Sequence, residues 1–517
     1  MDDGALLLPH GSSDIVDGVF DYAGRPASRS ATGRWISAAF IIWVEIGERF
    51  SYYGVSSNLI SYLTGPLRES TATAAAAVNV WSGVASMLPL LGAFIADSYF
   101  GRYRTIVGAS LLYMLLSSCP CTIRQWREEP QGLSLMTLSS LHSSPCGEAA
   151  TTDPADCAPA PSQVVSFYAS LYLMALAQGC HKPSVQAFGA DQFDDDHPAE
   201  RAAKSSFFNW WYFGLIAGVL VANLLLTYIQ DYVSWALGFG IPCLAMAAAL
   251  LVFLLGTKTY RLYPLYTNSS TKCPGDGRRG DLKRLLPLLP IWAASLPYAV
   301  VFSQSPTLFT KQGATLDRRL GPNFELPAAS LQVCSSVAII TFVVVYDRLL
   351  VPLARRLTKR PSGITMLQRI GTGMFISLLS IVVSALVEIK RLEVARESDD
   401  GVAPMSMWWL VPQYALFGVA DVFTMIGLQE FFYDQVPEAY RSLGLGLYLS
   451  IFGVGSLLSG GLVSAIDKIS KMGGGDSWFA DDINRGHFDY FYWLLAGLSG
   501  VGLVLFLNFA KAYVYKK

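Results

Sequence analysis

The chain has 517 residues, of which 52% are hydrophobic, 13% aromatic and only 15% charged, with a formal net charge of -1 at pH 7. Soluble proteins usually carry about 25% charged residues, so this composition excludes an ordinary soluble protein. The near-zero net charge also provides no basic surface for a nucleic-acid partner. Apolar runs long enough to cross a bilayer as α-helices recur along the chain, which predicts a membrane protein with many spanning helices.

The first 34 residues are polar and contain no basic segment followed by a short apolar run. This pattern differs from a cleavable signal peptide, so we expect a polar N-terminal tail and a first spanning helix that directs membrane insertion. Hydropathy and loop composition then predict an all-α membrane protein with about twelve transmembrane helices in two six-helix bundles. The predicted spans cover residues 35–64, 76–97, 104–125, 164–188, 206–229, 233–256, 285–310, 329–350, 364–388, 406–432, 442–466 and 488–512.

A polar stretch at residues 258–283 separates the two groups of six spans. Its composition, which includes Pro274-Gly275-Asp276-Gly277, is typical of a linker rather than a folded domain. The predicted organisation is a tail at 1–34, a first bundle at 35–257, the linker at 258–283, a second bundle at 284–513 and a tail at 514–517.

Basic residues gather in the short loops that follow even-numbered spans. Arg102 and Arg104 follow the second predicted span, and Arg355 and Arg356 follow the eighth. The opposite loops mix basic with acidic residues, as at 393–400. Because positively charged loops stay on the cytoplasmic side, both termini are expected to be cytoplasmic. The equivalent position of the two basic loops also suggests two halves related by an axis along the membrane normal.

Three charged residues lie inside the first predicted span. Glu45, Glu48 and Arg49 occupy positions i, i+3 and i+4, so they share one helical face. Each charge placed in hydrocarbon costs about 2.5–3.5 kcal/mol, so the three are expected to face a cavity or one another. One interpretation is an internal salt bridge that merely permits folding. The other is a proton-coupling site, because burial favours a protonated carboxylate and the Arg favours an ionised one.

Tyr52 and Tyr53 lie on the next turn of the same predicted helix. Beside Arg49 they would offer a solute hydroxyl donors or aromatic walls, and simple packing is the alternative.

The loop after the second predicted span resembles the loop signature of the major facilitator superfamily. Its residues run from Gly92 to Arg104 and include Asp97, Arg102 and Arg104. Small residues in this stretch allow helices to approach closely, and its acid and bases can bridge neighbouring helices. We expect Asp97, Arg102 and Arg104 to serve gating and structure rather than solute contact.

Longer blocks of sequence resemble the plant nitrate/peptide transporter family, the relatives of proton-dependent oligopeptide transporters within that superfamily. Glu45, Glu48 and Arg49 match the family's ExxER motif, and residues 207–212 (FFNWWY) match its fifth-span signature. Residues 188–194 and 361–371 are similar to further family blocks. The resemblance covers nearly the whole chain and implies the two-bundle major facilitator fold and proton-coupled transport of a small solute.

Lys182 in the fourth predicted span and Glu430 near the inner end of the tenth are charges that need partners. The resemblance implies that they pair with each other across the two halves. Such a bridge would break when the carboxylate takes a proton or when substrate arrives, which would bias alternating access. A permanent structural pair is the alternative.

Three departures from the family concern the substrate pocket and the linker. Phe302 stands in the seventh span where the plant nitrate carrier has a His, and Ser303 replaces the acid of microbial peptide symporters. Ile216 replaces the Asn of the fifth-span signature, and the linker is shorter than in most plant relatives. The coupling motif is intact, whereas neither the nitrate pocket nor the peptide pocket is.

The residues proposed to bind substrate are chosen from their positions in the predicted spans. They are Arg49, Tyr52, Tyr53, Phe302, Gln304, Thr307 and Gln429. Arg49 and Lys182 are the cations available to an anionic solute. The alternative for each polar residue is a hydrogen bond to a neighbouring helix.

No metal, cofactor or enzymatic activity is expected from the sequence. It contains no CxxC or Cys/His spacing of a metal site, no Gly-rich phosphate loop and no nucleophile elbow, so the coupling proton is the only expected co-ligand. Cys146 and Cys157 lie in a predicted outer loop, where a disulfide and two free thiols both remain open.

Three functions compete. The first is a proton-coupled symporter of a small solute, namely nitrate, a short peptide or a plant hormone or metabolite. The second is a solute sensor with little net transport, and the third is an uncoupled facilitator, which the intact acid pair and Arg49 disfavour. The expected partners are the solute, protons and the bilayer; the oligomeric state is left open. Residues 2–7 (DDGALL) fit an acidic dileucine sorting pattern, so the plasma membrane and the vacuolar membrane both remain open.

Overall fold

The computed structural model defines most of the chain. It describes residues 14–115, 161–194, 196–263, 286–321, 324–358, 364–397, 403–436, 441–472 and 476–513. The dileucine pattern, Cys146, Cys157 and most of the predicted linker lie outside these residues.

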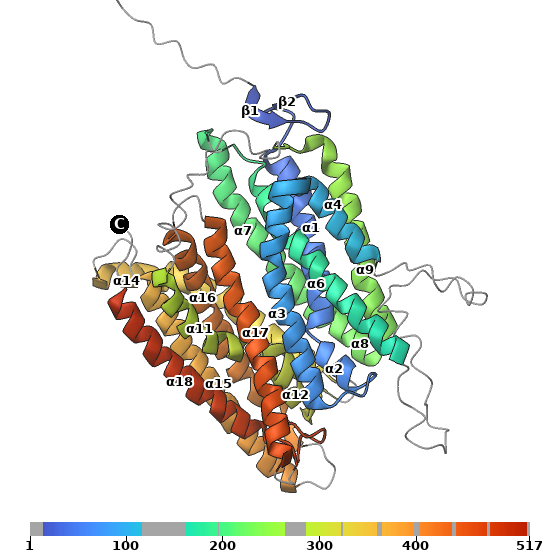
Figure 1. The fold of residues 1–517 in the computed structure, drawn as a ribbon, viewed down its shortest axis with the longest axis vertical. Helices are drawn as coiled ribbons and strands as arrows, with labels where there is room; N and C mark the ends of the chain where they lie inside the picture. The colour runs from blue at the N-terminus through green and yellow to red at the C-terminus, as the bar shows by residue number, and fades with distance from the viewer. Residues whose placement is uncertain are drawn as a thin grey trace, which may run out of the picture.

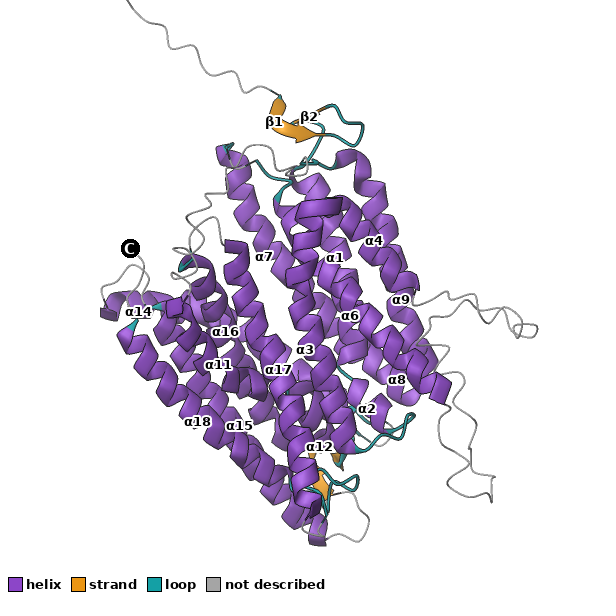
Figure 2. Cartoon of the chain, in the orientation of Figure 1, coloured by secondary structure: helices purple, strands orange, loops and turns teal. Residues whose placement is uncertain are grey.

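Each of the twelve predicted spans has a helical counterpart among the described residues, and the protein is an all-α membrane protein (Figures 1 and 2). In the first half the helices are α1 (Arg34–Ser56), α2 (Leu59–Thr64), α3 (Thr71–Ile95), α4 (Arg102–Leu115), α6 (Pro161–Ala190), α7 (Pro198–Val221), α8 (Thr227–Tyr232) and α9 (Trp235–Leu255). In the second half they are α11 (Leu289–Phe302), α12 (Thr310–Ala314), α13 (Gln332–Val345), α14 (Val351–Thr358), α15 (Met366–Glu397), α16 (Val411–Asp434), α17 (Arg441–Met472) and α18 (Phe488–Ala512).

Short π and 3-10 segments extend or interrupt these helices. The π segments are η1 (Ala96–Phe100), η4 (Ala222–Leu226), η7 (Ser305–Phe309) and η9 (Tyr346–Leu350), and the 3-10 segments are η5 (Gly256–Thr259), η6 (Leu286–Leu288), η8 (Ala328–Leu331) and η10 (Met407–Leu410). Two small strand pairs complete the described structure: β1 (Ile15–Phe20) pairs with β2 (Pro26–Ser28), and β3 (Leu316–Asp317) pairs with β4 (Ala403–Ser406). Within the described residues, nine helical stretches are long and apolar enough to cross a membrane.

Several helix ends differ from the predicted ends, and local contacts explain two of these differences. The predicted helix at 35–64 is interrupted at Ser57, whose hydroxyl donates to Asn223 Oδ1 at 2.6 Å. The third helix begins at Thr71 rather than at residue 76, because the Ser70 hydroxyl accepts the Thr73 N–H at 3.2 Å and caps the helix.

The helices gather into two groups that lie side by side in Figure 1. Helices α1, α3, α4, α6, α7 and α9 pack among themselves, and α11, α13, α15, α16, α17 and α18 do the same. We call the side of the bundle that carries β1 and β2 the terminal side, and the opposite side, where α2 and α12 meet, the far side. The longest seam between the halves joins α3 to α17.

Polar contacts between the halves lie toward the far side. Five hydrogen bonds of this kind run from Asn79 to Ser459, from Thr71 N–H to Asp481, from Thr227 to Ser330, from Ser330 to the Asn223 carbonyl, and from Gln332 to the Ser57 carbonyl. Tyr228 and Phe324 add a stacked ring pair. Toward the terminal side α7 and α16 lie apart in Figure 1, whereas α3 and α17 stay in contact, with Leu90 against Gly446. The hydrogen bonds between the halves therefore lie toward the far side, while the α3–α17 seam also extends toward the terminal side.

The N-terminal tail contains a β-hairpin, a feature that its polar composition did not predict. Asp21 Oδ1 accepts the N–H groups of Ala23 and Arg25, both at 2.9 Å, and so closes the turn between β1 and β2. Phe20 exchanges backbone hydrogen bonds of 2.9 and 2.8 Å with Leu262, just after η5. This short hairpin would be marginal alone, and its pairing with the 260–262 segment stabilises it.

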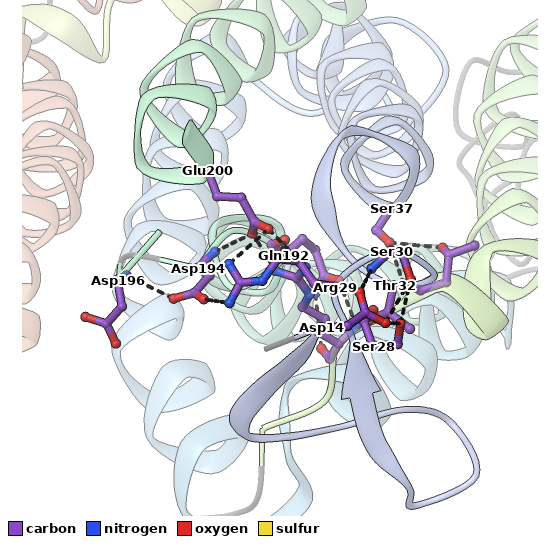
Figure 3. Close-up of polar contacts among 12 residues, drawn as sticks. Asp14, Ser28, Arg29, Ser30, Thr32, Ser37, Gln192, Asp194, Asp196 and Glu200 are labelled. Carbon is purple, nitrogen blue, oxygen red and sulfur yellow. Dashed lines mark hydrogen bonds and ion pairs between the residues drawn. The ribbon is translucent and has the colours of Figure 1, made fainter. Parts of the chain in front are cut away.

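Two arginines lie where the hairpin meets the first half, and Figure 3 labels one of them, Arg29. Arg29 Nη2 donates to Asp194 Oδ2 at 2.7 Å, where α6 leads into α7. Arg261 is fully buried and donates to Glu200 Oε2 at 2.6 Å. Asp194 N–H donates to the same Glu200 oxygen at 2.9 Å. We call the hairpin together with Arg29, Asp194, Glu200 and Arg261 the clamp.

Replacing the buried acid of the clamp is expected to destabilise the protein. Glu200→Gln leaves the Arg261 charge buried without a counter-charge, which should lower the free energy of unfolding by about 3 kcal/mol. Arg25→Gln is the matched control, because its ion pair with Asp21 is 70% exposed on the Arg side and should contribute less than about 1 kcal/mol. Thermal unfolding in detergent compares the two; equal shifts would contradict the role of the buried pair.

The clamp should also respond to acid. Partial burial acts to raise the pKa of Glu200, but hydrogen bonds from Arg261 and Asp194 N–H outweigh it, so the pKa lies below its usual 4.5. In Asp194, the Asp196 N–H and Arg29 outweigh burial in the same way and lower the pKa.

A carboxylate with a lowered pKa stabilises the fold above its unfolded pKa, and this stability is lost as the pH falls through the folded value. The clamp should therefore stay intact from about pH 7.5 to 5 and loosen below about pH 4. Hydrogen–deuterium exchange of residues 15–28, corrected for intrinsic rates, measures this. Loosening already at pH 5.5 would contradict the assignment.

Candidate functional site

The three charged residues of α1 form one buried cluster. Arg49 Nε donates to Glu45 Oε1 at 2.7 Å and lies 3.0 Å from Glu48 Oε2. The side chains of Glu45, Glu48 and Arg49 are 1%, 0% and 3% exposed, so water screens none of these charges. The helical spacing that places them on one face thus also brings them into ion-pair contact.

The cluster is only partly satisfied by hydrogen bonds. Tyr113 of α4 donates its hydroxyl to Glu48 Oε1 at 3.0 Å. Among the described residues, Glu45 Oε2, Glu48 Oε2 and Arg49 Nη2 are buried without a hydrogen-bond partner. A buried polar network with open donors and acceptors is costly, and such gaps in a native fold call for a functional explanation. These unpartnered atoms are the positions at which a proton or an anion could bind.

Helix α6 brings a further cation and a histidine to the cluster. Gly92 of α3 and Gly179 of α6 lie against each other so closely that a Cβ on Gly92 would overlap the Gly179 carbonyl. Pro183 lies inside α6 and removes one backbone hydrogen bond just after this contact. Lys182 is close enough to interact electrostatically with Arg49, Glu48 and Glu45. His181 interacts in the same way with Glu45. We call Glu45, Glu48, Arg49 and Lys182 the charge cluster.

The two tyrosines of α1 have different surroundings. Tyr52 stacks on Trp81 of α3, with ring centroids 5.4 Å apart and planes at 21°. Tyr53 meets Tyr52 edge to face at 5.4 Å and lies within electrostatic range of Arg49, Glu48 and Asp421 of α16. In this conformation Tyr52 packs on a ring of its own half, whereas Tyr53 interacts electrostatically with both the charge cluster and Asp421 of the second half.

Asp421 is the functional candidate that the sequence reasoning missed. Its side chain is 6% exposed and accepts the Tyr298 hydroxyl of α11 at 2.5 Å. Tyr53 and Tyr212 of the first half and Tyr448 of α17 lie within its electrostatic range. The signal was present, because Asp421 is a charge in the middle of the tenth predicted span.

Glu430, the acid predicted to pair with Lys182, does not lie at the charge cluster. Its side chain is 47% exposed, and its carboxylate lies 3.5 Å from Arg369 Nη1 of α15 in the same half. Among the described residues, Lys182 has no ion-pair partner, so the predicted Lys182–Glu430 bridge is not formed in this conformation. Glu430 lies two and a half turns beyond Asp421 toward the terminal side, where the halves diverge. The buried acid of α16 nearest the cluster is Asp421.

The remaining predicted pocket residues lie on the second half. Phe302 packs against Phe417 and Phe452, with ring centroids 5.6 and 5.2 Å away. Gln304 is buried and donates to the Val300 carbonyl and to Ser459. Thr307 is buried and donates to the carbonyl of Ser303, four residues earlier between α11 and η7, and Gln429 is exposed. Only Phe302 forms part of an aromatic wall.

The predicted gating residues lie at the terminal side of the first half. Arg102 at the start of α4 forms an ion pair of 2.5 Å with Asp191, which follows α6. Arg104 is exposed, and the side chain of Asp97 lies outside the described residues. The contact from Arg102 joins two neighbouring helices of one half.

Another buried ion pair, in the second half, has its polar atoms bonded. Glu388 and Arg391 of α15 are both fully buried and share two hydrogen bonds, of 2.8 and 2.7 Å. Gln312 donates to Glu388 at 2.8 Å, and Asn484 accepts from Arg391 at 2.7 Å. The polar atoms of this pair are satisfied, unlike those of the charge cluster. In the described part of the chain, no three His, Cys, Asp or Glu residues group as metal ligands would.

Comparison with known proteins identifies the family. The sequence profile of the POT family matches residues 130–274 and 278–479, more than half of the chain. The chain belongs to the POT family. This membrane transporter is 50% identical to protein NRT1/PTR FAMILY 5.10 of Arabidopsis thaliana over 96% of both chains. It is 47% identical to NRT1/PTR FAMILY 5.16 of the same plant, over 99% of this chain and 98% of that one. The predicted family is confirmed.

Solved POT-family structures share the fold. An auto-inhibited POT family peptide transporter superimposes with a TM-score of 0.72 at 22% identity, over 93% of this chain and 98% of that one. The POT family transporter PepTSo gives a TM-score of 0.72 at 21% identity, over 92% and 98%. The likeness at this identity concerns the fold, and it confirms the predicted major facilitator architecture.

Removing the arginine of this POT-family site should destabilise the protein in a pH-dependent way. Arg49→Gln leaves two buried carboxylates side by side, and breaking such a pairing costs about 3–5 kcal/mol. Acid should recover part of this loss, since protonating one carboxylate removes the repulsion. The measurement is thermal unfolding at pH 7.5 and 5.5, with Arg49→Lys as the control that keeps the charge. A loss that is equal at both pH values would contradict the arrangement.

Proposed function

We propose that this POT-family transporter is a proton-coupled symporter of a small anionic or zwitterionic solute that works by alternating access. The observation that carries the proposal is the buried cluster on α1, in which two carboxylates share one arginine and leave polar atoms without partners. The Glu388–Arg391 pair has no such gaps, but Arg261 of the clamp also keeps a buried atom without a hydrogen-bond partner, so the gaps support the proposal together with the two acids that face one arginine inside a spanning helix. The gaps are what a site needs if it is to gain and lose a proton in each cycle.

Coupling follows from competition for Arg49. In the ion-paired state, Arg49 holds Glu45 and Glu48. A proton on either carboxylate removes one negative charge and frees the guanidinium, which then attracts the anionic group of a solute. Proton and solute thereby raise each other's affinity through one shared cation, and this coupling is reciprocal. Lys182 contributes the second positive charge of the pocket.

The change of access is proposed to run through Asp421. In the present conformation the halves are joined at the far side, and Asp421 faces Tyr53 and Tyr212 of the first half without an ion pair to Lys182. When the halves close at the terminal side, Lys182 and Asp421 become available to each other. A bridge between them would favour the closed form until a proton or the solute breaks it.

The solute class is proposed from the charges and the departures from the family. Arg49 and Lys182 favour an anionic group, whereas Phe302 replaces the histidine and Ser303 the acid of known pockets. One POT family transporter that shares this fold was solved with 5-aminolevulinic acid, a zwitterion (TM-score 0.66, 16% identity). Nitrate, a short peptide, and a plant hormone or metabolite are the classes to be tested. A sensor with little net transport would use the same pocket.

The proposed orientation places the terminal side in the cytoplasm, together with both chain ends. Basic residues gather on that side in the loops after the even-numbered spans, as the positive-inside pattern requires. The membrane would be the plasma membrane or the vacuolar membrane.

The test is solute-evoked current in oocytes at outside pH 5.5 and 7.5. The panel is nitrate, dialanine, 5-aminolevulinic acid and abscisic acid. The native protein should give a larger inward current at pH 5.5 for at least one of them. Glu48→Gln should remove the pH dependence, and Lys182→Ala and Asp421→Asn should each lower the current by about tenfold or more.

Glu430→Gln is the matched control on the same helix as Asp421. Its carboxylate is half-exposed and faces Arg369, so its current should stay within about twofold of native. Uptake that ignores pH and survives Glu48→Gln would contradict symport and leave a facilitator. Solute binding without flux, measured by thermal shift on the purified protein, would favour the sensor.

A further inference from the structure

At the far side, two side chains of the second half bond to backbone carbonyls of the first half. The Ser330 hydroxyl donates to the Asn223 carbonyl at 3.0 Å, and Gln332 Nε2 donates to the Ser57 carbonyl at 2.9 Å. Ser330 lies in η8 and Gln332 begins α13, so one short stretch of chain presents both donors. All four residues are buried, with exposed fractions between 1% and 8%.

Both carbonyls come from irregular points of the first-half helices. Ser57 lies in the break between α1 and α2, and Asn223 lies in the π segment η4 between α7 and α8. Carbonyls at a helix end have no partner within the helix, and π segments are frequent at functional sites. Inside a bilayer, such a carbonyl has to be satisfied by protein or by water in a cavity. Here the second half supplies a donor to each of them.

Two hydroxyls of the first half brace this contact. The Ser57 hydroxyl donates to Asn223 Oδ1 at 2.6 Å and so joins the two irregular points to each other. The Thr227 hydroxyl donates to the Asn223 carbonyl at 2.6 Å and lies 2.7 Å from the Ser330 hydroxyl. Ser330 therefore meets two oxygen atoms of the opposite half. We call Ser57, Asn223, Thr227, Ser330 and Gln332 the latch.

The groups that make the latch are uncharged, which suits a contact that opens and closes. Exchanging one neutral hydrogen bond for bonds to water shifts an equilibrium by about fivefold. Separating the partners of a buried ion pair costs far more. Water that enters between separating halves can hydrogen-bond the two freed carbonyls. The latch is thus strong enough to bias the halves and weak enough to break in each transport cycle.

We propose that the latch holds the far side closed and sets how much of the protein is open to solute arriving from that side. Ser330 and Gln332 are positioning residues in this role, because they act on the arrangement of the halves. The inference rests on the alternating access of the proposed function and is independent of its proton coupling.

The latch has a consequence for apparent solute affinity. When the form able to bind far-side solute is only partly populated, the apparent dissociation constant is the intrinsic one divided by that populated fraction. Removing one hydrogen bond of the latch should raise the ratio of open to closed protein by about fivefold. While the open form remains the minority, the apparent affinity for far-side solute should rise by the same factor.

Cysteine labelling of the purified protein in detergent measures the opening without any solute. Ser330→Cys places a thiol at a position that is 2% exposed, so a hydrophilic maleimide reaches it only when the latch opens. Adding Gln332→Leu should make this labelling about fivefold faster than in Ser330→Cys alone. Mass spectrometry of the peptide that contains residue 330 gives the rate and separates it from labelling of native cysteines.

Ser335→Ala, added to Ser330→Cys, is the matched control. Ser335 is also a buried residue of α13, but its hydroxyl donates to the Tyr414 carbonyl of the same half at 2.9 Å. Its loss should leave the labelling rate within about twofold. Equal rates with Gln332→Leu and with Ser335→Ala would overturn the inference. If the Gln332→Leu protein does not fold, Thr227→Val tests the latch from the first half, with the same expected acceleration and the same contradicting result.

Transport kinetics give a second readout that a merely structural role would not move. Ser330→Ala should lower the apparent KM by about threefold to fivefold for whichever panel solute gives the largest native current, applied from the far side. A lower maximal current at an unchanged KM would contradict the latch. Unchanged labelling beside a pH-dependent native current would overturn the latch and leave symport intact. Faster labelling in a protein that gives no solute-evoked current would support the latch and contradict the proposed symport.

Discussion

The structure depends on how α1 buries two carboxylates against a single guanidinium. Charges at these positions are tolerated only if neighbouring helices supply partners. Helix α4 supplies a hydrogen bond from the Tyr113 hydroxyl, and α6 adds the positive charge of Lys182 nearby, without an ion pair. The glycine contact between α3 and α6 brings this part of α6 close. The packing of the first half is thus arranged around a polar centre that stays incompletely satisfied, and this incompleteness is where proton and solute would act.

The two halves contribute unequally to this centre. The first half holds the clustered charges, and the clamp ties its terminal end together through Arg261 and Glu200. The second half offers one buried acid, Asp421, beside tyrosines. The hydrogen bonds between the halves lie toward the far side among the described residues. In the proposed cycle the first half rocks against the second, and the charges of the polar centre decide which arrangement of the halves is more stable.

Most of the fold and part of the candidate site could be predicted from the sequence. The twelve spans were predictable because apolar runs of membrane length leave few alternatives. The cluster on α1 was predictable from its spacing, and the family from its motifs. Asp421 was passed over for Glu430, because hydropathy does not tell a buried charge at mid-helix from a half-exposed one near its end. The hairpin was missed, since long-range contacts such as Arg29–Asp194 stabilise it rather than local composition.

Infrared difference spectroscopy on the purified protein tests most directly whether the buried acid pair takes up a proton. It needs no solute, because a protonated carboxyl group has its own C=O stretching band. Between about pH 8 and 5.5, the native protein should gain a band of a buried carboxylic acid that shifts in 13C-glutamate-labelled protein, and Glu45→Gln combined with Glu48→Gln should abolish it. A native protein that gains no such band, or a double variant that gains the same one, would contradict a proton-binding role for the cluster.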